Sequence, residues 1–361
     1  MIICNIVVAV CLVLGSYVKF FNPEHWWFFG LLTLSLPYIL LTLLIFLFCW
    51  LFTRKIWMLI SLMAIAFCWK AMLNIFPLHL SPSFHKEKNS NSIRVMSWNV
   101  EHFDILEYKT HPEKKTEMIE LIKQYHPDIA CFQEMVGGDD DRAINYLGDF
   151  KRQLDFTGYY YSYETRLDFD QVHHFGIITF SKFPLLNKQT VRNPPYDYNS
   201  IFQYIDVPAG NDTVRVFNVH LQSLRFSQEN RKYLDHPETN TDTVLSESKS
   251  IISKLKHGFL KRAVQADSVR AAINRSPYPV IICGDFNDVP NSYAYCTIGD
   301  GLQNAFATKG FGFGRTFSGI SPTLRIDNIF ADKRFTIEQF TRVVKDLSDH
   351  FPIIADINLA R

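Results

Sequence analysis

Three almost uninterrupted apolar stretches open the chain, and residues 2–18 and 26–53 hold no charged side chain at all. A helix needs about 20 apolar residues to cross the hydrocarbon core of a bilayer. The pattern therefore predicts a membrane anchor over residues 1–78, with helices at about 2–20, 28–52 and 56–77. A cleaved signal peptide is the alternative for the first stretch. The absence of Lys and Arg from residues 1–5, and of a clear small-residue cleavage site, favours a retained helix.

The orientation of this anchor rests on one short basic loop. Arg54 and Lys55 separate the second and third apolar stretches, and such loops stay in the cytoplasm. Three crossings then place everything after residue 78 outside the cytoplasm, although Lys86 and Lys88 oppose this orientation. We expect a multi-pass protein of a bacterial-type inner membrane that contacts the lipid bilayer.

The pattern changes after a polar segment at 79–92, which is rich in Ser and Asn and is expected to be a linker. Short apolar runs typical of strands follow, with helical patterns at 112–125 and 243–274. Many strands with few helices between them predict an α/β or α+β sandwich, with helices outside two packed sheets, over 93–361. The strands are expected at 93–98, 129–133, 159–163, 175–180, 202–207, 214–219, 280–283, 326–330 and 353–357.

Charge divides the chain at the same place. The chain has 37 basic and 36 acidic residues, but residues 1–88 hold only six of the basic and two of the acidic ones. The remainder therefore has 31 basic and 34 acidic residues, a net charge of −3. This split excludes a single water-soluble globule, a disordered chain and a strongly basic nucleic-acid binder. The seven cysteines form no Cys-x-x-Cys pair, so we expect free thiols and no zinc site.

Polar side chains recur where the predicted strands begin or end. Carboxylates and Asn oxygens are the ligands that Mg²⁺ and Mn²⁺ prefer. Histidines among them can donate hydrogen bonds to phosphate oxygens or transfer protons. Together these groups suit metal-assisted attack of water on a phosphate ester. The residues are Asn99, Glu134, Asn218, His220, Asp285, Asn287, Asp327, Asp349 and His350.

Six short motifs, in this order, resemble those of the endonuclease/exonuclease/phosphatase superfamily, whose fold is DNase I-like. The resemblance implies a four-layered α/β sandwich and a metal-dependent phosphoesterase. The motifs are Ser97-Trp98-Asn99, Gln133-Glu134, Asn218-Val219-His220-Leu221, Gly284-Asp285-Phe286-Asn287, Arg325-Ile326-Asp327 and Ser348-Asp349-His350.

The resemblance implies a role for each matching residue in the reaction. Asp285 is expected to orient or deprotonate the attacking water, and Asn287 to contact the phosphate or transition state. His350 is expected to bind the scissile phosphate with Asp327 as its carboxylate partner, and His220 to act as a second catalytic histidine.

The resemblance also implies which residues bind the metal ion and which bind the substrate. Glu134 resembles the principal ligand for Mg²⁺ or Mn²⁺, with Asn99 and Asp349 contributing, and Glu101 is a further candidate. For substrate binding the candidates are Asn218 and Arg262, and Arg262 has a plain structural role as its alternative.

Three functions remain open from the sequence. The first is a membrane-anchored phosphodiesterase or phosphatase that acts on a lipid headgroup or another extracytoplasmic phosphoester. The second is an endonuclease or exonuclease outside the cytoplasm, which the net charge of −3 disfavours. The third is an inactive binding module, which the complete set of expected catalytic residues disfavours. No obligate protein partner is evident.

Overall fold

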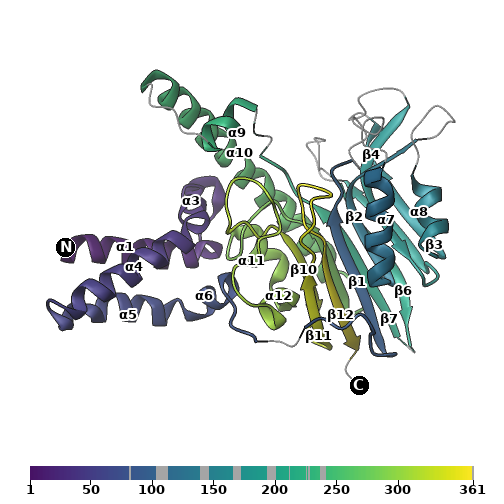
Figure 1. The fold of residues 1–361 in the computed structure, drawn as a ribbon, viewed down its shortest axis with the longest axis horizontal. Coiled ribbons are helices and arrows are strands. Elements are labelled where there is room, and N and C mark those ends of the chain that lie inside the picture. Colours follow the sequence, from purple (N-terminus) through teal and green to yellow (C-terminus); the bar gives the residue numbers. More distant parts are fainter. Residues whose placement is uncertain are drawn as a thin grey trace.

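The computed structural model describes residues 1–80, 83–102, 113–138, 146–165, 172–192, 201–210, 212–224, 226, 228–235 and 241–359. Within these ranges, the part after residue 91 contains two six-stranded sheets that pack face to face (Figure 1). The first sheet has the order β11-β12-β1-β2-β4-β3. Its strands are β1 (Ser92–Asn99), β2 (Ile129–Gly138), β3 (Gly158–Tyr163), β4 (His173–Ser181), β11 (Phe335–Arg342) and β12 (Ile353–Leu359).

The second sheet has the order β5-β6-β7-β8-β10-β9. In each sheet one central pair is parallel, β1 with β2 and β7 with β8, and the other pairs are antiparallel. The sheets are therefore mixed. The strands are β5 (Asn187–Arg192), β6 (Ile201–Ala209), β7 (Asp212–His220), β8 (Val280–Asp285), β9 (Leu302–Asn304) and β10 (Asp327–Asp332).

Three apolar clusters hold the layers together. One lies between the sheets and joins residues such as Val95 and Ile281. A second packs the outer face of the first sheet against α7 (Glu113–Tyr125) and α8 (Leu147–Gln153), and a third packs α10 (Thr241–Asn274) and α11 (Tyr293–Gly299) on the second sheet. The result is the helix–sheet–sheet–helix sandwich that the strand pattern predicted. Two shorter helices, α9 (Gln228–Asp235) and α12 (Ala305–Lys309), complete this part.

The N-terminal segment forms more and shorter helices than the sequence predicted. The helix expected at 28–52 is divided at Ser35 because Pro37, in the first turn of the second piece, cannot continue a preceding helix. The helix expected at 56–77 is bent at Cys68. The elements are α1 (Ile2–Ser16), η1 (Val18–Phe20), α2 (Pro23–Trp26), α3 (Phe29–Leu34), α4 (Leu36–Leu51), η2 (Lys55–Trp57), α5 (Met58–Phe67) and α6 (Trp69–Ile75).

Within the described ranges, no helix taken singly is both long and apolar enough to cross a bilayer. The pair Lys55–Phe67 and Trp69–Ile75 meets that requirement only when its two parts, bent by 67°, are counted together.

Polar contacts join the N-terminal segment to the sandwich. The buried Arg325 donates from Nη1 to the carbonyl of Ile75 at 3.3 Å and also donates to the carbonyl of Asn74, at the end of α6. A helix leaves its last carbonyls without partners, and a basic side chain there satisfies them. Asn291 Nδ2 donates to the carbonyl of Ala71 at 2.8 Å. Arg325, just before β10, and Asn291, just before α11, therefore join α6 to the sandwich.

A buried ion pair joins β1 to β12. Arg94 donates from Nε and Nη2 to the two carboxylate oxygens of Asp356 at 2.7 and 2.8 Å, and both side chains are 1% exposed. The guanidinium also donates to the carbonyls of His85 and Lys86. The segment expected to be a linker is thus held against the first sheet at these two residues.

We expect Asp356→Ala to lower the free energy of unfolding by about 3–5 kcal/mol, because it leaves the Arg94 guanidinium buried without its charge partner. Urea unfolding of the full chain, followed by far-UV circular dichroism, measures this loss. The control is Asp332→Ala, which removes the partner of the exposed Arg334 and should cost less than about 1 kcal/mol. Equal losses in the two variants would contradict the role given to the buried pair.

Candidate active site

Most of the polar residues predicted from the strand ends meet at one edge of the sandwich. In the parallel pairs, Asn99 stands opposite Gln133, and His220 stands opposite Asp285. The antiparallel neighbour β10 places Asp327 opposite Asp285 from the other side. Because parallel strands end at the same edge of a sheet, these side chains reach a common space.

Glu134 is aimed into that space by an irregularity in β2. The pairing of β2 with β4 shifts register between Phe132 and Met135, and Glu134 has a φ of 56°. A β-bulge redirects a side chain, and a non-glycine residue at positive φ is strained unless the surrounding structure compensates. The bulge explains how a residue inside a buried strand presents its carboxylate to the site.

Gly284 permits β8 to approach β7 closely just before Asp285. Its φ is +151°, and a Cβ there would lie 1.8 Å from the carbonyl oxygen of Val219. Any larger residue would push the strands apart at the point where His220 and Asp285 pair.

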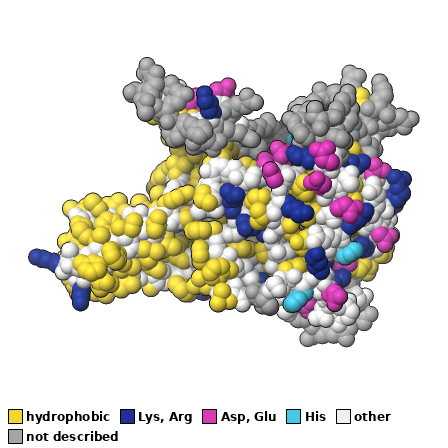
Figure 2. All heavy atoms as spheres, viewed as in Figure 1, with side chains coloured by type: hydrophobic (Ala, Val, Ile, Leu, Met, Phe, Trp, Pro, Cys, Tyr) yellow, Lys and Arg dark blue, Asp and Glu magenta, His cyan; other side chains and the backbone are white. Residues whose placement is uncertain are grey.

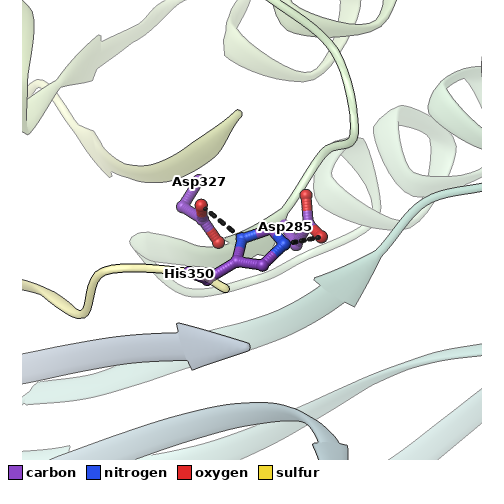
Figure 3. Close-up of side chains that lie close together, drawn as sticks. All are labelled: Asp285, Asp327 and His350. Carbon is purple, nitrogen blue, oxygen red and sulfur yellow. Dashed lines mark hydrogen bonds and ion pairs between the residues drawn. The ribbon is translucent and has the colours of Figure 1, made fainter. Parts of the chain in front are cut away.

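His350 lies between two buried carboxylates (Figure 3). Its Nδ1 is 2.9 Å from Asp327 Oδ2, and its Nε2 is 3.7 Å from Asp285 Oδ2. Burial alone would lower the pKa of His350, but the charges of Asp327 and Asp285 outweigh it and raise that pKa well above its usual value. The two carboxylates therefore favour the protonated form of the imidazole, in which Nδ1 donates to Asp327.

Asn99 links the carboxylates of the two sheets. Its Nδ2 donates to Glu134 Oε1 at 3.3 Å and to Asp285 Oδ2 at 3.2 Å. Burial raises the pKa of Glu134 to about 7 and also raises the pKa of Asp285. Ionisation of these buried carboxyl groups is unfavourable unless a positive charge lies nearby. The atoms available to bind a cation are the hard oxygen atoms of these side chains. These residues fit a divalent cation.

Asn287 and Asp349 also lie at this site. The backbone N–H of Asn287 donates to Asp285 Oδ1 at 2.7 Å and its side chain donates to Asp285 Oδ2 at 3.1 Å, which holds the carboxylate in one orientation. Asp349 has its Oδ1 3.9 Å from His350 Nε2, and its backbone N–H donates to Glu101 at 3.0 Å. Glu101, a further metal candidate, is thus part of the same cluster.

Two histidines flank Glu134, and the sequence identified only one of them. His220 Nε2 lies 3.7 Å from Glu134 Oε1 and 3.6 Å from Asp285 Oδ2, and burial lowers the pKa of His220 to about 4. His102 Nδ1 lies 3.4 Å from Glu134 Oε2, and burial lowers its pKa to about 4 as well. The one available signal for His102 was its position three residues after Asn99.

The structure places the two predicted substrate-binding residues differently, Arg262 at the pocket and Asn218 away from it. Asn218 is buried between the sheets, where it donates to the carbonyls of Phe132 and Ile178 and accepts from Gln133. Its amide therefore joins the sheets. Arg262 does line the pocket, but its guanidinium is buried and bonded to Asp288 and to the carbonyl of Gln222.

The acids, Asn287, Arg262 and His350 open into a pocket of about 530 Å³, within the range of small-ligand sites. Charged groups line this pocket together with apolar side chains, which come from α3, α10 and three loops. A buried acid and a protonated imidazole beside a space for ligand can orient water and hold an anionic group at the same time.

Solved structures share this fold. An endonuclease/exonuclease/phosphatase family protein from Leptotrichia buccalis aligns over 74% of this chain and 99% of its own, with 16% identity and a TM-score of 0.51. Humanized TDP2 of D. rerio aligns over 74% of this chain and 100% of its own, with 18% identity and a TM-score of 0.51. A mannosyl-6-phosphatase of Bacteroides thetaiotaomicron aligns over 74% of this chain and 99% of its own, with 17% identity and a TM-score of 0.50. These likenesses concern the fold.

Sequence comparison separates the chain into two matched parts. The model of a domain of unknown function, DUF8431, matches residues 1–75. A search of curated proteins gives no match. The model of the Endonuclease/Exonuclease/phosphatase family matches residues 96–350, which is well over half of the chain and includes every residue of the site described above. The chain therefore belongs to the endonuclease/exonuclease/phosphatase family of hydrolases that act on phosphoester bonds.

Proposed function

We propose that this protein is a membrane-anchored, divalent-metal-dependent phosphoesterase that hydrolyses a phosphodiester by attack of an activated water molecule. One observation carries the proposal: His350, paired with Asp327 and adjacent to Asp285, lines the same pocket as Glu134, and this pocket is large enough for a phosphoester. A cationic donor beside a buried acceptor is the pair of groups that phosphate ester hydrolysis needs.

Each polar group has a distinct task in this proposal. Asp285 orients the attacking water and accepts its proton, while Asn287 and Asn99 keep that carboxylate in place. His350 donates from Nε2 to a non-bridging phosphate oxygen, where negative charge accumulates as the water attacks. His220 is neutral, since burial lowers its pKa to about 4, and can exchange a hydrogen bond with the substrate.

A divalent cation, Mg²⁺ or Mn²⁺, would be held by Glu134, Asn99 and Asp349, with Glu101 within reach. When bound, it supplies positive charge that offsets the charge of the phosphate oxygens. The raised pKa of Glu134 is consistent with this assignment, because burial disfavours the charged carboxylate and the charge of His350 offsets this effect only in part.

The exposed surface of the N-terminal helices supports attachment to a membrane. Large apolar side chains cover α1, α4 and α5, which contrasts with the mixed charges over the sandwich (Figure 2). A continuous apolar surface of this kind marks a membrane or protein interface. The helices α1 and α4 have 15 and 16 residues, or about 22–24 Å at 1.5 Å per residue. A bilayer can thin locally to match such lengths.

We expect Glu134→Gln, Asp285→Asn and His350→Gln each to lower kcat for bis-p-nitrophenyl phosphate by at least about 100-fold, because each removes a charge that acts at the reacting phosphate. The measurement is release of p-nitrophenolate by the detergent-solubilised full chain in the presence of Mg²⁺ or Mn²⁺, and chelation of the cation should abolish it. Near-normal turnover in these variants would contradict the assignment.

Two control variants separate chemistry from folding. Asp267→Asn changes an exposed acid of α10 outside the pocket and should leave kcat unchanged. Asp327→Asn removes one of the charges that raise the pKa of His350, so His350 loses its proton at lower pH. We expect partial activity whose alkaline limit shifts to lower pH, an effect that a purely structural defect would not produce.

We expect residue 54 to lie in the cytoplasm and the sandwich outside it, because the basic pair Arg54 and Lys55 lies in the turn between α4 and α5. Alkaline phosphatase, which is active only outside the cytoplasm, should be active when fused after residue 361 and inactive when fused at residue 54. The reverse pattern would contradict this topology.

A further inference from the structure

The walls of the catalytic pocket are apolar, and one of them comes from the N-terminal segment. Leu34 at the end of α3 lines the pocket together with Leu255 and Phe259 of α10. Ile320 also lines it, from the loop between α12 and β10. A phosphate with a small polar substituent would leave this surface in contact with water, which is unfavourable.

The contact between α3 and α10 is close and specific. A Cβ at Gly30 would lie 2.9 Å from the ring of Phe259, so only glycine allows the helix to approach this ring. Lys256 Nζ lies 5.4 Å from the ring centre of Trp27, a cation–π distance. The wall that α3 contributes is therefore fixed against the helix that carries Phe259.

The apolar wall continues onto the exposed surface of α4. Leu41, Ile45 and Phe48 are 56%, 55% and 65% exposed and follow one another at helical spacing along a single face. The same face begins at Tyr38, whose hydroxyl lies 3.0 Å from Ser321 Oγ. Ser321 is the neighbour of Ile320. The hydrogen-bonded pair Tyr38 and Ser321 thus joins the apolar face of α4 to the loop that carries Ile320, a residue that lines the pocket.

Ile320 is held in an unfavourable conformation at the mouth of the pocket. Its φ is 62°, which a β-branched residue seldom adopts, and its side chain is 43% exposed. Burial does not compensate this strain, since much of the side chain remains in contact with solvent. Strained residues of this kind are concentrated at sites that bind ligands.

We propose that the substrate is an amphiphilic phosphoester with a long alkyl or acyl chain, which enters from the bilayer. Its phosphate reaches Asp285 and His350, while its chain lies against Leu34, Phe259 and Ile320 and extends along the exposed face of α4. This assignment rests on the proposed phosphoesterase function and names the class of molecule on which it acts.

Two synthetic diesters that differ only in one alkyl group test the proposal. Methyl p-nitrophenyl phosphate and hexadecyl p-nitrophenyl phosphate release the same p-nitrophenolate, so their chemistry is matched. With the full chain in dodecyl maltoside micelles of fixed concentration, we expect kcat/KM for the hexadecyl ester to exceed that for the methyl ester by at least about 10-fold, since burial of the alkyl chain against the apolar side chains favours binding.

Ile320→Asn gives the decisive variant, because Asn tolerates positive φ and the change relieves strain while it removes the apolar contact. We expect it to lower kcat/KM at least 10-fold for the hexadecyl ester and less than 3-fold for the methyl ester. Leu34→Gln should act in the same direction. Val344→Asn, at an exposed apolar position outside the pocket, is the matched control and should alter neither value.

The outcomes distinguish this proposal from the proposed function. Similar kcat/KM values for the two esters, with equal effects of Ile320→Asn on both, would overturn the proposal of an amphiphilic substrate. The protein would then be a phosphoesterase that acts on small substrates. Single-stranded DNA cleaved with a higher kcat/KM than the hexadecyl ester would overturn it in favour of a nuclease. Hydrolysis of neither ester nor DNA would overturn the phosphoesterase assignment itself, and the amphiphile with it.

Discussion

The carboxylates Glu134, Asp285 and Asp327 meet at one edge of the two sheets, where little water reaches them. Bringing like charges together out of water is costly, and the rest of the site can be understood as the means of compensating for it. His350 supplies one positive charge, between Asp327 and Asp285. Asn99 and Asn287 donate hydrogen bonds to the remaining oxygens. Glu134 keeps a pKa raised to about 7, which marks the place where positive charge is still needed.

The backbone is shaped to maintain this arrangement. Glu134 and Asn287 both have positive φ, and Gly284 brings β7 and β8 together where a Cβ would collide with the carbonyl of Val219. These local costs are offset by the apolar layers on both faces of the sheets. The N-terminal helices join the same framework, because Arg325 binds the end of α6 two residues before Asp327. Hydrogen bonds of Arg325 therefore connect the catalytic edge of the sheets to the N-terminal helices.

Sequence alone could predict the sandwich and most of the site, because both depend on local pattern. Buried strands such as β8 are continuous apolar runs, and their polar last residues identify the edge where Asp285 and His220 meet. Edge strands such as β5 and β11 went unpredicted, since their exposed faces interrupt the apolar pattern. The division of the second N-terminal helix at Ser35 went unpredicted, because the apolar pattern continues through Pro37 without a break. The positions of the remaining residues depend on contacts between distant parts of the chain, which local pattern does not reveal. Asn218 joins the sheets, Arg262 is bonded to Asp288, and His102 enters the site through a turn at positive φ.

Binding of a divalent cation by the resting protein tests the central claim most directly, since it needs no knowledge of the substrate. Titration of the full chain with Mn²⁺, followed by calorimetry and by the unfolding temperature, should show one saturable site that raises that temperature. Glu134→Gln should weaken this binding at least about 10-fold, whereas Asp267→Asn should leave it unchanged. Equal Mn²⁺ affinity in the chain and in Glu134→Gln, or the absence of any saturable site, would contradict the account.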